Sequence, residues 1–183
     1  SREKMLARMK RIDPPADNLK ATFKFPYENT GSANALRVEK LSVGYGHPLL
    51  APVTFSMTMG EKLLFTGFNG VGKSTLIKSI LKKIPALGGT ATFSPSAKVN
   101  YFDQDLEWDD PSLTPLQMIQ NMCPTMQPKT IRQKLARAGI NAANTMKPLH
   151  LLSGGEQTKV KLAILELTPS NFLIMDEPTN HLD

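Results

Sequence analysis

Apolar positions along the chain follow two different periods, one typical of strands and the other of helices. Alternation of apolar and polar residues over 36–38 and 53–57 predicts two strands, and the compact apolar run 62–66 predicts a third. Strands are also predicted at 99–102 and at 172–175, where the run is apolar throughout. A strand without polar positions is expected to be buried on both faces of a sheet.

Helical spacing separates these strands. Residues 74–83 and 154–167 each predict one helix, and residues 113–152 predict several shorter ones. Breaks between the shorter helices are predicted at Pro115, Pro124, Pro128, Gly139 and Pro148. Strands that alternate with helices favour an α/β fold with a mostly parallel sheet covered on both faces.

The front of the chain has a different composition. Apolar residues within 1–12 recur at helical spacing with basic residues between them, and Pro14 and Pro15 end the pattern. We therefore expect a short amphipathic helix there. Residues 13–35 carry Pro, Asn, Gly and Ser with little periodicity, which is typical of an extended connector. The compact domain is expected to occupy residues 36–183.

Length and composition narrow the class of protein. With 183 residues the chain suits one domain. It has no apolar run of about 18 residues and does not begin like a signal peptide, so a cytoplasmic protein without a membrane span is expected. Cys123 is the only cysteine, which excludes an intramolecular disulfide and fits a reducing compartment.

The net charge of +6 is concentrated at the front of the chain. Residues 1–12 contain five basic side chains and one acidic side chain. A helix of this kind could contact an RNA backbone, and the basic residues could equally form its solvated face. Both interpretations stay open on the residues alone.

A glycine-rich segment between a predicted strand and a predicted helix matches the pattern G-x-x-x-x-G-K-[ST]. Its backbone N–H groups can surround phosphates, and the helix N-terminus adds its dipole. Lys73 can reach the outer phosphates and the Ser74 hydroxyl can ligate Mg²⁺, so ATP and Mg²⁺ are the expected ligands. The predicted ATP-binding residues of this P-loop are Gly67, Phe68, Asn69, Gly70, Val71, Gly72, Lys73, Ser74 and Thr75.

The apolar strand at 172–175 is followed by two acidic residues, Asp176 and Glu177. Ligands of open α/β sheets bind at the carboxyl ends of strands. Asp176 is expected to hold the Mg²⁺ shell, and Glu177 to accept a proton from the attacking water or to orient it. On its own, an apolar strand followed by Asp-Glu is the ordinary pattern of a strand that ends at the solvent. The functional interpretation of the two acidic residues therefore depends on the P-loop upstream.

Residues 153–157 read Ser-Gly-Gly-Glu-Gln at the start of the late helix. Ser153 and Glu156 fit a capping box, which alone would explain both residues. Gly154 and Gly155 lower the stability of the first turn, yet they also allow backbone N–H groups to approach an anion at the positive end of the helix.

The order of P-loop, residues 153–157 and the Asp-Glu pair resembles the ATP-binding-cassette family, with its signature and Walker B motifs. The resemblance implies a P-loop NTPase fold with a mostly parallel sheet, an antiparallel β subdomain and a helical subdomain at about residues 106–153. It also implies that the signature closes over ATP held by a second cassette, in the same full-length chain or in a head-to-tail homodimer. The residues touching the partner's γ-phosphate would be Ser153, Gly154, Gly155, Glu156 and Gln157.

Three further positions can be compared with the family pattern. Gln104, after the strand at 99–102, resembles the Q-loop glutamine, which contacts Mg²⁺ and the attacking water. Tyr45 resembles the aromatic residue that stacks on adenine. Ordinary turn chemistry is the alternative for both. None of the histidines, His47, His150 and His181, stands where the family carries its switch histidine, so we expect this chain alone to bind ATP and to hydrolyse it poorly.

The two ends of the chain are similar to the ABC-F group, which comprises tandem-cassette proteins without a membrane domain. The similarity rests on residues 177–183, Glu-Pro-Thr-Asn-His-Leu-Asp, and on residues 1–6. It implies that 1–12 ends an interdomain linker and that the chain is a second cassette, incomplete at its C-terminus. The ribosome, with its rRNA and tRNA, is then the expected partner, in translation or in antibiotic resistance by ribosome protection. The alternative is the ATPase subunit of a membrane transporter.

Overall fold

The computed structural model describes residues 21–26, 34–103, 105 and 107–178. The predicted linker helix at 1–12, Gln104, and the family-like residues 179–183 with His181 therefore lie outside the described residues. Within the described part, no helix combines the length and the apolarity needed to cross a bilayer.

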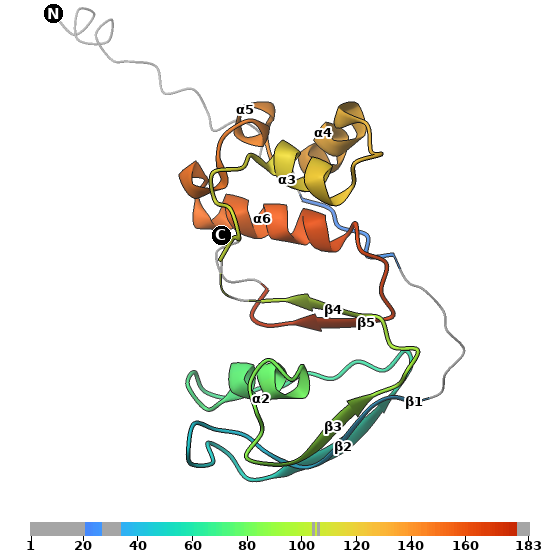
Figure 1. Ribbon diagram of the computed structural model, residues 1–183, viewed down its shortest axis with the longest axis vertical. Helices are drawn as coiled ribbons and strands as arrows, with labels where there is room; N and C mark the ends of the chain where they lie inside the picture. Colours follow the sequence, from blue (N-terminus) through green and yellow to red (C-terminus); the bar gives the residue numbers. More distant parts are fainter. Residues whose placement is uncertain (1–20, 27–33, 104, 106, 179–183) are drawn as a thin grey trace, which may run out of the picture.

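An antiparallel sheet forms one end of the molecule (Figure 1). Its strands are β1 (Asn34–Ser42), β2 (Val53–Thr58) and β3 (Gly88–Phe93), in the order β2-β1-β3. Val38, at the centre of β1, is 0% exposed and lies opposite Phe55 of β2. The alternation that predicted β1 and β2 thus marks the face that packs into the core.

Strand β3 was not predicted by the sequence pattern. It opens with Gly88 and Gly89, and glycine weakens a strand because it has no side chain to pack. Gly89 has a φ of +74°, and a Cβ there would lie 2.2 Å from the carbonyl oxygen of Lys40. Close backbone approach therefore requires the glycine, and the buried Ala91 with the partly buried Phe93 anchors the strand to the core.

Helix α2 (Lys73–Ile80) packs its apolar face on this sheet through Leu76 and Ile80. The helix was expected to reach residue 83. It ends earlier because Lys82 adopts a left-handed φ of 58°, and the N–H of Lys83 donates to the carbonyl of Lys78 at 2.8 Å. This is the hydrogen-bond pattern that closes many helices, here without the usual glycine.

A parallel pair of strands lies between the antiparallel sheet and the helices above it (Figure 1). Strand β4 (Val99–Phe102) pairs in parallel with β5 (Phe172–Met175). Helix α6 (Gly154–Leu165) covers the pair, and its Leu162 and Leu165 bury against Phe102. The helix begins where the capping residues predicted and ends two residues before the expected 167.

The prediction of a strand at residues 62–66 is wrong. These residues form no strand in the structure, and Leu64 is 81% exposed. An apolar run predicts burial, but a strand also needs a neighbouring backbone to pair with, and the described residues supply none. The segment instead lines a cavity of about 760 Å³ together with β5. Leu173 of β5 is 37% exposed, so the expectation that this strand is buried on both faces is also wrong.

A layer of helices forms the other end of the molecule (Figure 1). Besides α6, its elements are α3 (Pro115–Met122), α4 (Pro128–Arg137), α5 (Ala142–Thr145) and the 3-10 helix η1 (Leu149–Leu151). Pro115 and Pro128 are the first residues of their helices, where a missing N–H is tolerated, so the predicted breaks lie directly before them. Ile119, Ile131 and Val160 are fully buried in a shared core.

Two parts of the predicted connector at 13–35 are described. Asn34 and Ala35 already belong to β1, so the connector ends earlier than predicted, whereas residues 21–26 are extended and pack on this helical layer. The N–H of Thr22 donates to the carbonyl of Arg137 at 3.0 Å, and the rings of Phe23 and Phe25 stack at 6.4 Å. Both rings contact buried residues of the helical layer and of β4. The α/β fold expected from the sequence is thus confirmed, with a parallel sheet, an antiparallel sheet and a helical layer.

Candidate nucleotide-binding site

The P-loop turns sharply between residues 62–66 and helix α2. Gly70 and Gly72 have left-handed φ values of 81° and 103°, which other residues adopt at a cost. Gly72 is the N-cap of α2, and no side chain of the described residues caps it. The first N–H groups of α2 are therefore available to an anion, as the motif predicted.

Lys73 lies over its own loop. Its ammonium group donates to the carbonyl of Gly67 at 2.9 Å and to that of Phe68 at 3.0 Å. An ammonium has three N–H donors, so Lys73 can also donate to a phosphate oxygen without leaving these carbonyls. Next to it, Ser74 is half-buried and Thr75 is buried, which leaves Ser74 as the hydroxyl accessible to a metal ion.

The two acidic residues after β5 lie at the same cavity as the P-loop lysine. Lys73, Asp176 and Glu177 all line the cavity of about 760 Å³. Asp176 is 3% exposed, and its N–H donates to the carbonyl of Phe102 at 3.0 Å, which extends the pairing of β4 and β5. The structure therefore brings together residues that are far apart in the sequence.

One oxygen of Asp176 supports the predicted metal. Its Oδ2 is buried and has no hydrogen-bond partner among the described residues. A buried carboxylate oxygen without a partner is costly unless a cation or donor compensates it. Mg²⁺ prefers carboxylate and hydroxyl oxygens, so Asp176 and Ser74 fit a Mg²⁺ ion that also binds phosphate.

Glu177 follows in an unusual backbone conformation. Its φ is 45°, in the left-handed region that costs a residue with a side chain about 1–2 kcal/mol. Such conformations occur where the surrounding structure imposes them, often at functional sites. Here the conformation turns the chain directly after β5 and places Glu177 at the edge of the cavity.

Tyr45 lies in a tight turn beside the P-loop. The turn is closed by the pairing of Gly44 with Pro48, and the Tyr45 side chain is 64% exposed. Leu49, which follows the turn, packs so close to the P-loop that a Cβ on Gly72 would lie 3.3 Å from its Cβ. An exposed ring near the loop suits the predicted stacking on adenine, which stays a prediction.

Replacing Gly72 by alanine is expected to lower the free energy of unfolding by about 2 kcal/mol, because left-handed backbone strain and a crowded Cβ act together. The added Cβ would lie 3.1 Å from Cδ2 of Leu50. Gly60→Ala is the matched control, since its φ is +85° but nothing lies within 4 Å of its Cβ. That variant should lose about 1 kcal/mol. Urea denaturation measures both, and equal losses would show that the P-loop is not crowded at Gly72.

The signature-like residues open helix α6 as a capping box. Glu156 Oε2 accepts from the backbone N–H of Ser153 at 2.9 Å, and the Ser153 hydroxyl accepts from the N–H of Glu156 at 3.3 Å. Glu156 also accepts from the side-chain amide of Asn144. The capping interpretation is confirmed, and at this helix end Ser153 is exposed while Gly154 and Gly155 are half-buried.

Gln157 is held at both ends of its side chain. Its Oε1 accepts from the indole N–H of Trp108 at 2.7 Å, and its Nε2 donates to the carbonyl of Leu152 at 3.0 Å. Residues 153–157 do not line the cavity that contains Lys73. Their predicted contact with a nucleotide held by a second cassette stays a prediction.

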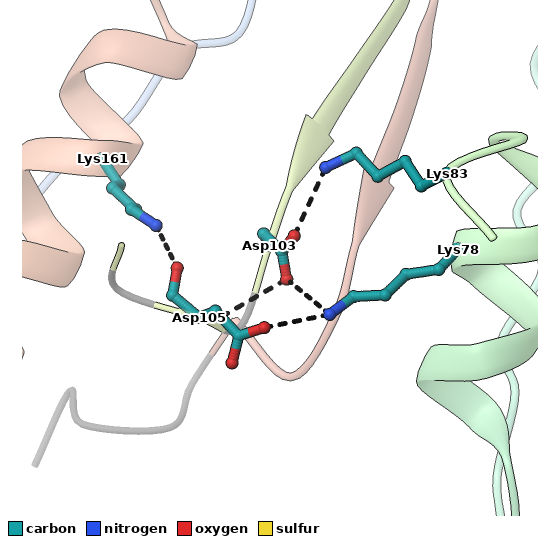
Figure 2. A network of polar contacts seen from close by, with 5 residues as sticks. All are labelled: Lys78, Lys83, Asp103, Asp105 and Lys161. Atoms are coloured by element: carbon teal, nitrogen blue, oxygen red, sulfur yellow. Dashed lines mark hydrogen bonds and ion pairs between the residues drawn. The ribbon is translucent and has the colours of Figure 1, made fainter. Parts of the chain in front are cut away.

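The sequence analysis missed a network of charged residues that flank position 104 (Figure 2). Lys78 of α2 lies 2.9 Å from Asp105 and 3.5 Å from Asp103, and Lys83 lies 3.4 Å from Asp103. The hydrogen bond that Lys78 donates to the carboxylate of Asp105 raises the pKa of Lys78. Burial acts to raise the pKa of Asp103, but the N–H of Asp105 and the two ammonium groups hold it below its usual value. The acidic residues on either side of Gln104 were the only signal in the sequence that could have indicated this network.

Two neighbours extend this network toward the strands and the helical layer. Burial, with the negative charges of Asp103 and Asp176, raises the pKa of Tyr101, so its hydroxyl stays neutral. Burial lowers the pKa of Lys161, whose ammonium lies 5.4 Å from the ring centroid of Trp108 and donates to the carbonyl of Asp105. The segment after β4 is therefore bound to α6 as well as to α2.

Comparison with known proteins places this site in a family. A sequence profile described as ABC transporter matches residues 50–180. The chain is 38% identical to the ATP-binding protein YdiF of Bacillus subtilis, over 100% of this chain and 29% of that protein. It is 32% identical to the ATP-binding protein YheS of Escherichia coli K12 and 30% identical to the protein GCN20 of Saccharomyces cerevisiae, again over 100% of this chain.

These relatives are much longer than the chain, which covers 29% of YheS and 25% of GCN20. Solved structures are also similar. An ABC transporter ATP-binding protein from Pyrococcus furiosus has a TM-score of 0.61 at 24% identity, covering 78% of this chain and 75% of that one. For cbiO1 of Clostridium perfringens, part of the transporter complex cbiONQ, the TM-score is 0.56 at 26% identity, with coverages of 82% and 68%.

The predicted family is confirmed by the profile match and by relatives that span the whole chain. The motif order therefore predicted the family and its fold correctly. The chain belongs to the ATP-binding-cassette family, and its relatives are ATP-binding proteins of the ABC-F type.

Proposed function

We propose that this chain is the ATP-hydrolysing cassette of an ABC-F protein that acts on the ribosome in the cytoplasm. The observation that carries the enzymatic part is the shared cavity of Lys73, Asp176 and Glu177, with a buried Asp176 oxygen that has no partner among the described residues. A magnesium nucleotide would supply both the cation for Asp176 and the phosphates for the P-loop.

The residues of the cavity divide the work of phosphoryl transfer. Lys73 and the N–H groups at the start of α2 would hold the outer phosphates and neutralise charge that develops on them. Asp176 and Ser74 would hold Mg²⁺, which when bound neutralises phosphate charge. Glu177, at the edge of the same cavity, would orient the attacking water or accept its proton. Gln104, outside the described residues, is proposed to contact the same ion and water.

A second cassette would complete the site. The exposed Ser153 and the backbone of Gly154 and Gly155 form the positive end of α6, and they do not line the cavity of their own P-loop. This arrangement supports contact with ATP held by another cassette, in the same full-length chain or in a head-to-tail homodimer. The chain alone is then expected to bind ATP and to turn it over slowly.

The ribosomal part of the proposal is supported by the sequence. The relatives at 30–38% identity are of the ABC-F type. Residues 1–12, with five basic side chains and one acidic one, suit contact with an RNA backbone such as that of rRNA or tRNA. Whether such a protein serves ordinary translation or antibiotic resistance depends on contacts beyond this cassette.

Sedimentation with ribosomes tests this proposal. Full-length protein carrying Glu177→Gln should sediment with ribosomes in the presence of MgATP, because closed cassettes that cannot hydrolyse ATP stay bound. The same protein with Lys73→Ala added, or without nucleotide, should remain in the supernatant. Recovery of the Glu177→Gln protein in membranes and not with ribosomes would contradict the ribosomal role and favour a transporter ATPase.

A further inference from the structure

The sequence segment that builds most of the helical layer has no acidic residue. Residues 111–155 contain neither Asp nor Glu, whereas the short segment 103–110 before them contains five acidic residues. The basic residues of 111–155 are Lys129, Arg132, Lys134, Arg137 and Lys147. Four of these five positive charges belong to helix α4, and no negative charge close in sequence balances them.

Helix α4 carries its charges and its apolar residues on different sides. Ile131 and Leu135 are 0% exposed and belong to the core of the helical layer. Lys129 and Arg132 are exposed, and their spacing of three residues makes them neighbours on the helix surface. The exposed amide of Gln133 lies next to Arg132 in the sequence. Figure 1 shows α4 at the end of the molecule opposite the antiparallel sheet.

The exposed charges of α4 are largely uncompensated. No acidic side chain of the described residues forms an ion pair with Lys129 or Arg132. Arg137, at the end of the helix, lies 3.5 Å from Glu166. A group of like charges without partners raises the local positive potential, which attracts a polyanion.

The connector adds a further positive charge beside this helix. The N–H of Thr22 donates to the carbonyl of Arg137 at 3.0 Å, which places residues 21–26 next to the end of α4. Phe23 and Phe25 pack against the core, and Lys24 between them is exposed. The basic surface is defined here as Lys24, Lys129, Arg132 and Arg137.

The chemistry of the basic surface suits an RNA backbone better than a lipid or a protein. A helix that binds a membrane inserts its apolar side chains, but those of α4 are already buried in the core. Protein interfaces are centred on aromatic and large aliphatic side chains, and the exposed positions of α4, a helix described in full, contain neither. Contacts with a phosphate backbone need only Lys, Arg and polar side chains such as Gln.

We propose that the basic surface binds the phosphate backbone of ribosomal RNA. The inference rests on the proposed action on the ribosome, and it names a contact surface within the cassette itself, separate from residues 1–12. Lys129 and Arg132 would each contact a phosphate and release counterions, so the contact weakens as the salt concentration rises. Such contacts orient a protein on RNA without reading the base sequence.

The salt dependence of ribosome binding tests this surface. Full-length protein carrying Glu177→Gln is sedimented with ribosomes in MgATP at a series of KCl concentrations. Lys129→Gln together with Arg132→Gln should weaken binding about tenfold, and the slope of log Kd against log KCl concentration should fall by about 2. Arg137 is retained in this double variant, because its replacement would leave Glu166, whose side chain is 10% exposed, without its ion pair.

Two further variants separate the position of the charges from their number. Lys40→Gln together with Lys82→Gln removes the same charge from exposed positions in β1 and after α2, and should bind ribosomes like the parent protein. Lys129→Arg together with Arg132→Lys keeps both charges and should retain the slope. Calorimetry with MgATP and thermal unfolding should be unchanged in all variants, since none of the replaced residues lines the cavity that contains Lys73.

Each outcome supports or overturns the proposal. Equal Kd values and slopes for the double variant of α4 and its parent would overturn the RNA contact and leave the ribosomal role intact. Weaker binding with an unchanged slope would also overturn it, because the lost contact would not be with phosphate. Binding to phosphatidylserine vesicles that only the parent shows, with ribosome binding unchanged, would assign the surface to lipid. Failure of the parent itself to sediment with ribosomes would overturn the proposed function, and the contact with it.

Discussion

Lys73→Ala is expected to weaken MgATP binding at least about a hundredfold. The ammonium group of Lys73 lies over the P-loop, bound to the carbonyls of Gly67 and Phe68, and borders the cavity that contains Asp176. A charge-assisted hydrogen bond to phosphate contributes about 1.5–3 kcal/mol, and Lys73 can make one or two of them while also neutralising charge. Isothermal titration calorimetry of magnesium nucleotide into folded protein measures the loss directly.

The control for this variant is Lys129→Ala, which removes an exposed positive charge from α4, away from the P-loop. It should bind MgATP like the parent protein, because one distant surface charge is screened by salt. Thermal unfolding of both variants separates a loss of binding from a loss of folding. Full-affinity binding by Lys73→Ala would mean that this loop does not hold the nucleotide, and the proposed function would fail with it.

The parts of the site that the sequence predicted are those whose signal is local. The glycines of the P-loop, Lys73 and the capping pair Ser153 and Glu156 each depend on neighbours within one turn of the chain, and the structure has the expected conformations at all of them. Asp176 was predicted as the residue after an apolar strand, and its pairing with Phe102 follows from that strand.

The parts that were missed depend on pairing between distant segments. Residues 62–66 have the composition of a strand, but composition does not show which backbone would pair with them. Strand β3 was missed for the opposite reason. Its opening glycines are weak strand formers, so the composition gives no strand signal, but the backbone of β1 lies so close that only glycine fits there. Lys78 and Asp105 are 27 positions apart, and no local pattern announces an ion pair of that kind.

Glu177→Gln is expected to leave MgATP binding nearly unchanged and to lower the kcat for ATP hydrolysis of the full-length protein by about 10²–10⁴. Glutamine keeps the size of the side chain and the backbone conformation at φ 45°, so the turn after β5 should persist. It removes the carboxylate that would accept a proton from water. Steady-state ATPase assays give kcat, and equilibrium dialysis of labelled ATP gives the affinity.

The comparison with Asp176→Asn makes the assignment of Glu177 specific. Asp176 is buried and carries the oxygen without a partner, so its replacement removes a metal ligand and should weaken binding that depends on Mg²⁺. The two neighbouring carboxylates should therefore differ: Asn at 176 raises the Kd for MgATP, and Gln at 177 lowers kcat at constant Kd. If Glu177→Gln kept its hydrolysis rate while Asp176→Asn lost it, the metal-bound carboxylate alone would support the reaction and the base would have to be sought elsewhere.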